Sequence, residues 1–196
     1  MIKILFLGAS LLALTACKTT RVSYDDPAAI EPMSTGFSLS DLYQVSDTMV
    51  NSMLTSPALA GLTGEKRPIL LVDRIQNRTD QHIDTESITD TIRTQLIQSG
   101  RFRFTDKTTR DAQSEEIHYQ SFGGAVASEY AIERGRQVGA EYLLIGSIVS
   151  YEERTKDTLR KSYKMTLNFI DLKTGIIEWA QEKPITKVQS KGAFRR

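Results

Sequence analysis

The only cysteine of this 196-residue chain, Cys17, directly follows an apolar amino-terminal segment. Lys3 gives the segment a positive start, the run from Ile4 to Leu14 carries no charge, and the two residues before the cysteine are small. A basic tip, a short apolar core and small residues before a cut are typical of a secretory signal peptide. The run is far shorter than the roughly 20 residues that a membrane-spanning helix needs. We therefore predict that residues 1–16 are a signal peptide.

The chain that follows the cut contains no cysteine after Cys17, so its fold cannot depend on internal disulfide bonds. The cut removes Lys3 and no acidic residue, which leaves 25 − 1 = 24 lysines and arginines against 24 acidic residues. Balanced charge does not favour a nucleic acid as partner. The length fits one domain with a core of ordinary size, held together by packing.

The four residues Leu14-Thr15-Ala16-Cys17 resemble the lipobox of bacterial lipoproteins. The resemblance implies that Cys17 carries an S-diacylglycerol and an N-acyl chain, with no other cofactor. Several acyl chains anchor a protein firmly, because each buried methylene contributes about 0.8 kcal/mol. In lipoproteins an Asp after the cysteine favours the inner membrane, and Lys18 stands there instead. The resemblance therefore implies the periplasmic face of the outer membrane. The alternative is a plain signal peptide with an incidental cysteine.

Residues 17–39 are predicted to be the lipidated cysteine and a flexible tether. Pro27, Pro32, the pair Asp25-Asp26 and scattered small polar residues leave little apolar periodicity there. Some twenty residues reach at most about 70 Å when fully extended, so the tether is short. Residues 40–196 are predicted to form the globular domain.

The spacing of apolar residues predicts a first helix that begins near Ser40 and ends before Pro57. Met49 and Met53 belong to its apolar stripe, which predicts either a core face or a partner groove, and a core face is the more common use. Gly100 stands where a helix typically ends in a left-handed residue. The remaining predicted helices cover residues 84–99, 106–120 and 128–139.

Strands are predicted at 69–72, 101–104, 142–149, 163–169 and 176–179. Gly146 marks either a bulge or a close approach of two backbones. Residues 152–161 are predicted to be a charged connection, and Pro184 and the basic residues after it a tail. Early alternation of helices and strands predicts parallel pairing, and the late run of strands predicts a meander. The expected fold class is α/β: a single domain with a mixed four- to five-stranded sheet flanked by helices.

Catalytic and metal-binding patterns are missing from the sequence. His82 and His118 have no second ligand at the usual spacing. No glycine-rich phosphate loop or Gly-x-Ser-x-Gly elbow occurs, and paired carboxylates stand in polar stretches that would not raise a pKa. We therefore predict no catalytic and no metal-binding residues, and a binding or regulatory domain rather than an enzyme.

Several segments resemble the LpoB family of penicillin-binding-protein activators. They are Val72–Thr79 with the helix that follows it, Ile97–Phe102, Val138–Tyr142 and Thr174–Trp179. The last three patterns are also similar to the amino-terminal domain of TolB and to CsgG-like lipoproteins. The resemblance implies a TolB N-terminal-like fold in an outer-membrane lipoprotein that is not itself an enzyme. It further implies that the protein binds the regulatory domain of a bifunctional class A penicillin-binding protein and stimulates glycan polymerisation and peptide crosslinking.

Asn77, Arg78 and Thr79 are the candidate partner-binding residues, because loops at the carboxyl ends of strands often carry binding sites. A simpler interpretation is that Asn77 and Thr79 bond the backbone of their own loop while Arg78 pairs with Asp73 or Asp80.

We expect a monomer. The alternative function is a CsgG-like or TolB-like lipoprotein that serves secretion or envelope structure. A ring-forming protein of the CsgG-like kind needs long alternating strands, and segments 142–153 and 161–171 are too short by this estimate.

Overall fold

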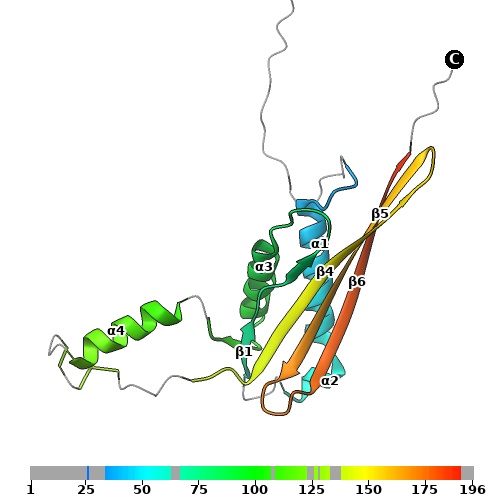
Figure 1. The fold of residues 1–196 in the computed structure, drawn as a ribbon. Helices are drawn as coiled ribbons and strands as arrows, with labels where there is room; N and C mark the ends of the chain where they lie inside the picture. The colour runs from blue at the N-terminus through cyan, green and yellow to red at the C-terminus, as the bar shows by residue number, and fades with distance from the viewer. Residues whose placement is uncertain are drawn as a thin grey trace, which may run out of the picture.

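The computed structural model describes residues 26, 34–62, 67–106, 109–122, 126–127, 129–132 and 138–190. The predicted signal peptide and Cys17 lie outside these residues, so their assignment stays a prediction. In the described part of the chain a six-stranded sheet carries helices on one face (Figure 1). No helix in this part combines the length and the apolar character needed to cross a membrane.

The helices are α1 (Leu39–Thr55), α2 (Pro57–Ala60), α3 (Thr85–Gln98) and α4 (Arg110–Phe122). The strands are β1 (Ile69–Val72), β2 (Gln76–Arg78), β3 (Arg103–Phe104), β4 (Tyr142–Arg154), β5 (Thr158–Asp171) and β6 (Ile177–Ser190). The strand order is β3-β1-β4-β5-β6, with β2 pairing to β4 beyond the end of β1. Pairs among β1 to β4 are parallel, whereas β4, β5 and β6 form an antiparallel meander. This confirms the α/β class and the mixed sheet, which has one strand more than the predicted maximum.

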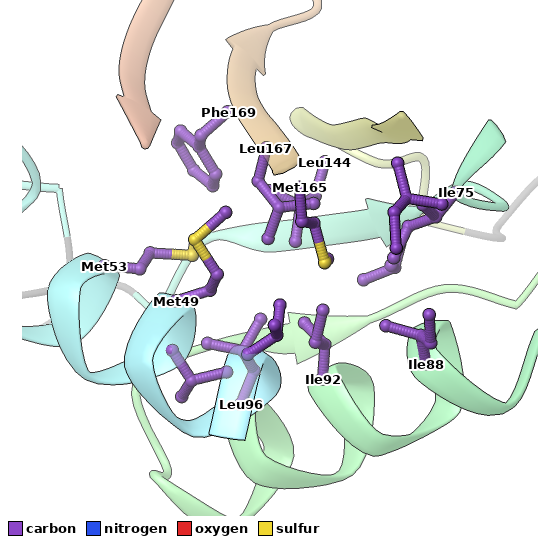
Figure 2. Packing of buried hydrophobic residues seen from close by; sticks show 14 of the residues in the cluster. Met49, Met53, Ile75, Ile88, Ile92, Leu96, Leu144, Met165, Leu167 and Phe169 are labelled. Atoms are coloured by element: carbon purple, nitrogen blue, oxygen red, sulfur yellow. The ribbon is translucent and has the colours of Figure 1, made fainter. Parts of the chain in front are cut away.

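Helix α1 places its apolar stripe in the core. Its amino-terminal cap is Ser38, two residues before the expected Ser40, and Asp41 accepts a hydrogen bond of 2.7 Å from the Ser38 N–H. Met49 and Met53 are 0% and 1% exposed and pack against the sheet and α3 (Figure 2). The methionine stripe is therefore core and not a partner groove.

Helix α3 supplies the other half of this layer. Asp84 caps it by accepting hydrogen bonds from the N–H groups of Glu86 and Ser87, which decides between Asp84 and Thr85, the two caps that the sequence allowed. Ile88, Ile92 and Leu96 point toward the sheet (Figure 2). Gly100, with φ of +69°, follows the end of the helix in the left-handed conformation expected there.

Strand β2 lies inside the segment predicted as a polar loop. Leu70–Val72 pair with the start of β4, and Gln76–Arg78 pair with Ser147–Val149 further along the same edge. Between them the buried Ile75 donates its N–H to Thr89 Oγ1 on α3. The loop prediction was wrong because β4 extends past β1 and offers unpaired backbone groups, which polar residues satisfy as well as apolar ones.

The meander is longer than the sequence indicated. Residues 152–161, predicted as a charged connection, belong to β4 and β5 except for the turn at 155–157. Charged side chains pair across the strands there, as in the 3.2 Å contact between Arg160 Nη1 and Glu153 Oε2. Strand β6 continues through Pro184 to Ser190, so the predicted tail was also wrong. Proline is tolerated because β6 is an edge strand, where its nitrogen can face away from β5.

The helix predicted at 128–139 is absent from the described residues. Residues 129–132 and 138–140 form turns and irregular backbone, and the others in this range lie outside the described residues. Tyr130 and Val138, expected on its packed side, are exposed, so no apolar face is buried to hold a helix. Helix α4 is present near its predicted place and lies apart from α1 and α3 (Figure 1).

Candidate partner-binding surface

The sheet face opposite α1 and α3 is uncovered in the described part of the chain (Figure 1). Register places alternate residues of β4, β5 and β6 on this outer face, including the row Val149, Lys164 and Pro184. Tyr151 on the same face is 60% exposed. Lys164 and Glu182 form a 2.9 Å ion pair across it. The outer face is therefore a solvent-facing surface that mixes charged and apolar side chains on the strands of the sheet.

Asn77 and Thr79 stabilise the turn that follows β2. Asn77 Nδ2 donates to the Gln81 carbonyl at 2.8 Å, and Asn77 Oδ1 accepts from the Thr79 N–H at 3.0 Å. The Thr79 hydroxyl lies 3.0 Å from the same carbonyl and accepts from the Gln81 N–H at 3.2 Å. These bonds confirm the simpler interpretation for Asn77 and Thr79, which hold their own turn.

Arg78 is the member of the predicted trio that faces outward. It is exposed, and its pairing with Val149 places its side chain on the outer face. Within the described residues Arg78 forms no ion pair, and Asp80 is instead bonded to Lys161 and Ser150. The pairing of Arg78 with Asp73 or Asp80, part of the simpler interpretation, was wrong for the residues that the structure describes.

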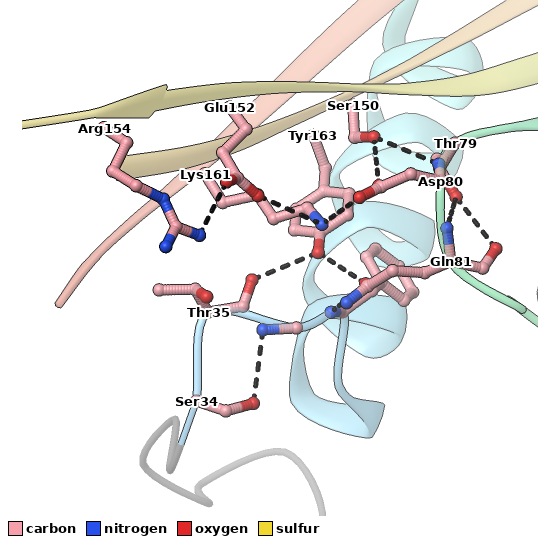
Figure 3. A network of polar contacts seen from close by, with 12 residues as sticks. Ser34, Thr35, Thr79, Asp80, Gln81, Ser150, Glu152, Arg154, Lys161 and Tyr163 are labelled. Atoms are coloured by element: carbon pink, nitrogen blue, oxygen red, sulfur yellow. Dashed lines mark hydrogen bonds and ion pairs between the residues drawn. The ribbon is translucent and has the colours of Figure 1, made fainter. Parts of the chain in front are cut away.

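Asp80 joins the turn to the meander (Figure 3). Its Oδ2 lies 2.7 Å from Lys161 Nζ, and its Oδ1 accepts from the Ser150 hydroxyl at 2.8 Å. The hydrogen bond from Lys161, followed by that from Ser150, lowers the pKa of Asp80. The same bond, which Lys161 donates to Asp80, raises the pKa of Lys161. The side chain of Lys161 is only 6% exposed, whereas that of Asp80 is 60% exposed.

This asymmetry predicts unequal effects of removing the two partners. Asp80→Asn leaves a nearly buried ammonium with Glu152 Oε2 at 3.8 Å as its nearest remaining carboxylate. Lys161→Met leaves only a carboxylate that water can solvate. We expect Asp80→Asn to lower the thermal unfolding midpoint at pH 7 more than Lys161→Met does. If the two variants lowered the unfolding midpoint equally, or Lys161→Met lowered it more, the result would contradict the burial of Lys161 and the exposure of Asp80.

The pKa directions give the pH dependence of this difference. A lowered carboxyl pKa stabilises the fold above its ordinary value of 3.8 and stops doing so as the pH falls through the folded value. Because the pKa of Lys161 is raised above its ordinary value of 10.5, the ammonium stays charged throughout the acidic and neutral range. The gap between wild type and Asp80→Asn should therefore narrow as the pH falls below about 4, which unfolding scans across this range would measure.

Sequence reasoning missed Gln81, Tyr163 and Lys161 in this network. Tyr163 matched an alternating strand pattern, which reports burial but not the partner of its hydroxyl. Lys161 fell in a segment of high charge, which predicts solvent exposure. His82 is exposed and the ring of His118 stacks on Phe122 at 4.7 Å. Among the described residues no group of three potential metal ligands exists.

Comparison with known proteins gives the family. A family model described as the peptidoglycan-synthase activator LpoB matches residues 41–185. The chain belongs to the LpoB family. LpoB is a family of activators, in agreement with the expectation that the protein is not an enzyme. No curated protein matches the sequence significantly.

Solved LpoB structures show modest similarity to the chain. The LpoB C-terminal domain from Escherichia coli is 23% identical with a TM-score of 0.47, and covers 74% of this chain and 98% of its own. The corresponding domain from Salmonella enterica is 19% identical with a TM-score of 0.47, and the match covers 74% of this chain and 98% of that domain. The NMR structure of E. coli LpoB is 18% identical with a TM-score of 0.42, covering 91% of this chain and 87% of its own.

Proposed function

We propose that this LpoB-family protein is an outer-membrane lipoprotein that activates a bifunctional class A penicillin-binding protein. Cys17 carries the lipid anchor, and the outer face around Arg78 binds the regulatory domain of the enzyme. The proposal is carried by one observation: Arg78 is an exposed cation on an uncovered sheet face and forms no ion pair with any residue that the structure describes.

Activation by such a domain is a shift of population. The protein has no predicted catalytic group, so it can accelerate the synthase only by binding the active conformation more tightly than the inactive one. A twofold preference gives at most a twofold shift of the conformational equilibrium, so strong activation requires contacts made in the active conformation alone. An arginine with five donors in a rigid fork suits such contacts with a carboxylate.

The short tether limits where this contact takes place. Residues 18–33 would reach at most about 55 Å if fully extended. The regulatory domain of an enzyme anchored in the inner membrane must therefore stand well out into the periplasm to meet this protein. The proposal thus predicts a partner with an extended periplasmic region.

Arg78→Glu tests the surface directly. We expect the variant to lose binding to the captured synthase at least about tenfold, because a carboxylate replaces a guanidinium that faces the partner. Stability should change by less than about 0.5 kcal/mol, because the side chain is exposed and makes no ion pair in the described structure. The measurement is a pulldown from detergent-solubilised membranes of the host, followed by a glycan-polymerisation assay on the captured enzyme.

Lys173→Glu is the matched control, since it reverses an exposed positive charge in the turn between β5 and β6. It should bind and activate like the wild type. Full binding by Arg78→Glu would move the interface away from this surface. Capture of a secretion component in place of a synthase would favour the CsgG-like or TolB-like alternative. The shortness of the two predicted strands counted against the CsgG-like kind. That reason no longer holds, since β4 and β5 span 13 and 14 residues.

A further inference from the structure

Residues 34–38, at the end of the predicted tether, lie against the domain and are named the strap below. The Phe37 N–H donates to Gln81 Oε1 at 3.2 Å, and the Phe37 ring meets the Tyr163 ring edge-on, with centroids 5.5 Å apart. The Tyr163 hydroxyl lies 3.1 Å from the Thr35 carbonyl. Figure 3 shows this contact beside α1 and the turn after β2. The chain therefore enters the domain through a docked segment.

A buried lysine holds the other side of the strap. Lys187 Nζ on β6 donates to the Gly36 carbonyl at 2.7 Å and lies 3.2 Å from Ser38 Oγ. It also pairs with Asp41 in the first turn of α1. The side chains of Lys187 and Asp41 are only 7% and 8% exposed. The strap is thus fixed by the edge strand as well as by the turn.

Gln81 belongs to both the strap contact and the turn. Its side chain accepts from Phe37 and lies 2.6 Å from the Tyr163 hydroxyl, while its backbone carbonyl receives the bonds of Asn77 and Thr79. Burial raises the pKa of Tyr163, which keeps the hydroxyl protonated and able to donate. Tyr163 has one proton to donate, and its hydroxyl lies within hydrogen-bond distance of both Gln81 on the turn and Thr35 on the strap.

The geometry points to an energetic coupling between the strap and the turn that carries Arg78. When the strap is docked, Gln81 is held from both sides and the turn keeps the conformation that presents Arg78. When the strap is pulled away, Gln81 Oε1 loses the bond from the Phe37 N–H and Tyr163 loses its packing on the Phe37 ring, so the side chain of Gln81 is less restrained and the turn loosens. The direction and tension of the tether thereby regulate partner binding, and by reciprocity a bound partner fixes the strap. The regulatory part of this inference rests on the proposed function.

Amide hydrogen exchange measured by NMR tests the coupling without a partner. The protein is the full chain from residue 17 on, with Cys17→Ser so that no lipid is attached. Gly36→Val perturbs the contact between the strap and Gln81, because an added Cβ would stand 3.3 Å from Ser34 Oγ and 3.3 Å from Gln81 Nε2, and the valine methyl groups would crowd both. Tyr163→Phe perturbs it from the sheet side by deleting the shared donor. We expect both variants to speed exchange at Phe37 and, through the coupling, at Thr79 and Gln81 by at least about fivefold.

Ser162→Ala is the matched control for Tyr163→Phe. The Ser162 hydroxyl is the neighbouring one on β5 and bonds to Thr186 on the outer face, at 2.9 Å, away from the strap. It should leave exchange at all three amides unchanged. The Leu144 amide lies in the core and exchanges only when the whole domain opens. Its exchange rate should stay constant in Gly36→Val, even if Tyr163→Phe, a substitution at a buried position, unfolds the protein.

Each outcome decides the inference. Faster exchange at Phe37 with unchanged rates at Thr79 and Gln81 in Gly36→Val would overturn the coupling, and so would unchanged rates at all three. In the binding assay, Gly36→Val should weaken capture of the synthase about fivefold or more. Loss of the exchange coupling would leave the Arg78 surface standing, whereas full binding by Arg78→Glu would sink the proposed function and leave the exchange result intact.

Discussion

Lys187→Met should lower the free energy of unfolding by about 3 kcal/mol. The substitution keeps the aliphatic volume of the side chain but leaves the buried Asp41 carboxylate without its cation. Two donors from Ser38, its N–H at 2.7 Å and its hydroxyl at 2.8 Å, remain on Asp41 and place the loss at the low end of the usual range for a broken buried pair. Urea unfolding followed by circular dichroism measures the change.

A double-mutant cycle separates the pair from the rest of the site. Asp41→Asn with Lys187→Met removes both charges, so the double variant should be less destabilised than the sum of the two single variants. Additive losses would show that the two charges do not interact. Lys183→Met is the control, since Lys183 lies on the same strand, faces the same side and is only half-buried. It should change stability by less than about 1 kcal/mol.

Gly146→Ala should lower the free energy of unfolding by about 3 kcal/mol. A Cβ added at this position would stand 2.5 Å from the Thr166 carbonyl oxygen and 2.5 Å from Leu167 Cδ2. The first of these is backbone in the centre of the β4–β5 pair, so the strands would have to separate to accept a methyl group. The pairing is continuous at Gly146, which resolves the two sequence alternatives in favour of a close approach over a bulge.

Gly61→Ala is the matched control for the same chemical change. Gly61 has ordinary right-handed dihedrals, with φ −72° and ψ −27°, and nothing lies within 4 Å of its added Cβ. The variant should be as stable as the wild type or more stable by up to about 1 kcal/mol, because alanine restricts the unfolded chain. Equal losses at Gly146 and Gly61 would contradict the assigned contact.

Elements with a strong periodic pattern were predictable from sequence. Strand β1 was predicted with its observed bounds, and α3 with its cap at Asp84 or Thr85, of which the structure has Asp84, and its end before Gly100. These features are local: the spacing of apolar residues reports which face is buried, and caps satisfy nearby backbone groups. The hairpin of β5 and β6 was located for the same reason, although its length was not.

Features that depend on distant residues were not predictable. Residues Gln76–Arg78 form a strand only because the free edge of β4 lies beside them. Lys161 can be buried because it pairs with a carboxylate 81 positions away in sequence, and a charged residue without that partner would face solvent. Pro184 was predicted to begin a tail because the sequence does not say that β6 is at the edge of the sheet, where a strand tolerates proline.

The candidate site also combines features that the sequence predicts with features that only the tertiary structure shows. The sequence alone determined the LpoB-like segment and its position after a buried strand, and it offered the local bonding of Asn77 and Thr79 as one of two interpretations, because such bonds are short-range. Only the tertiary structure placed Arg78 on an uncovered face, paired Asp80 with Lys161, and brought the strap against Gln81. Those arrangements require hydrogen bonds and ion pairs between residues far apart in the chain, and such pairs form only once the sheet and helices have packed.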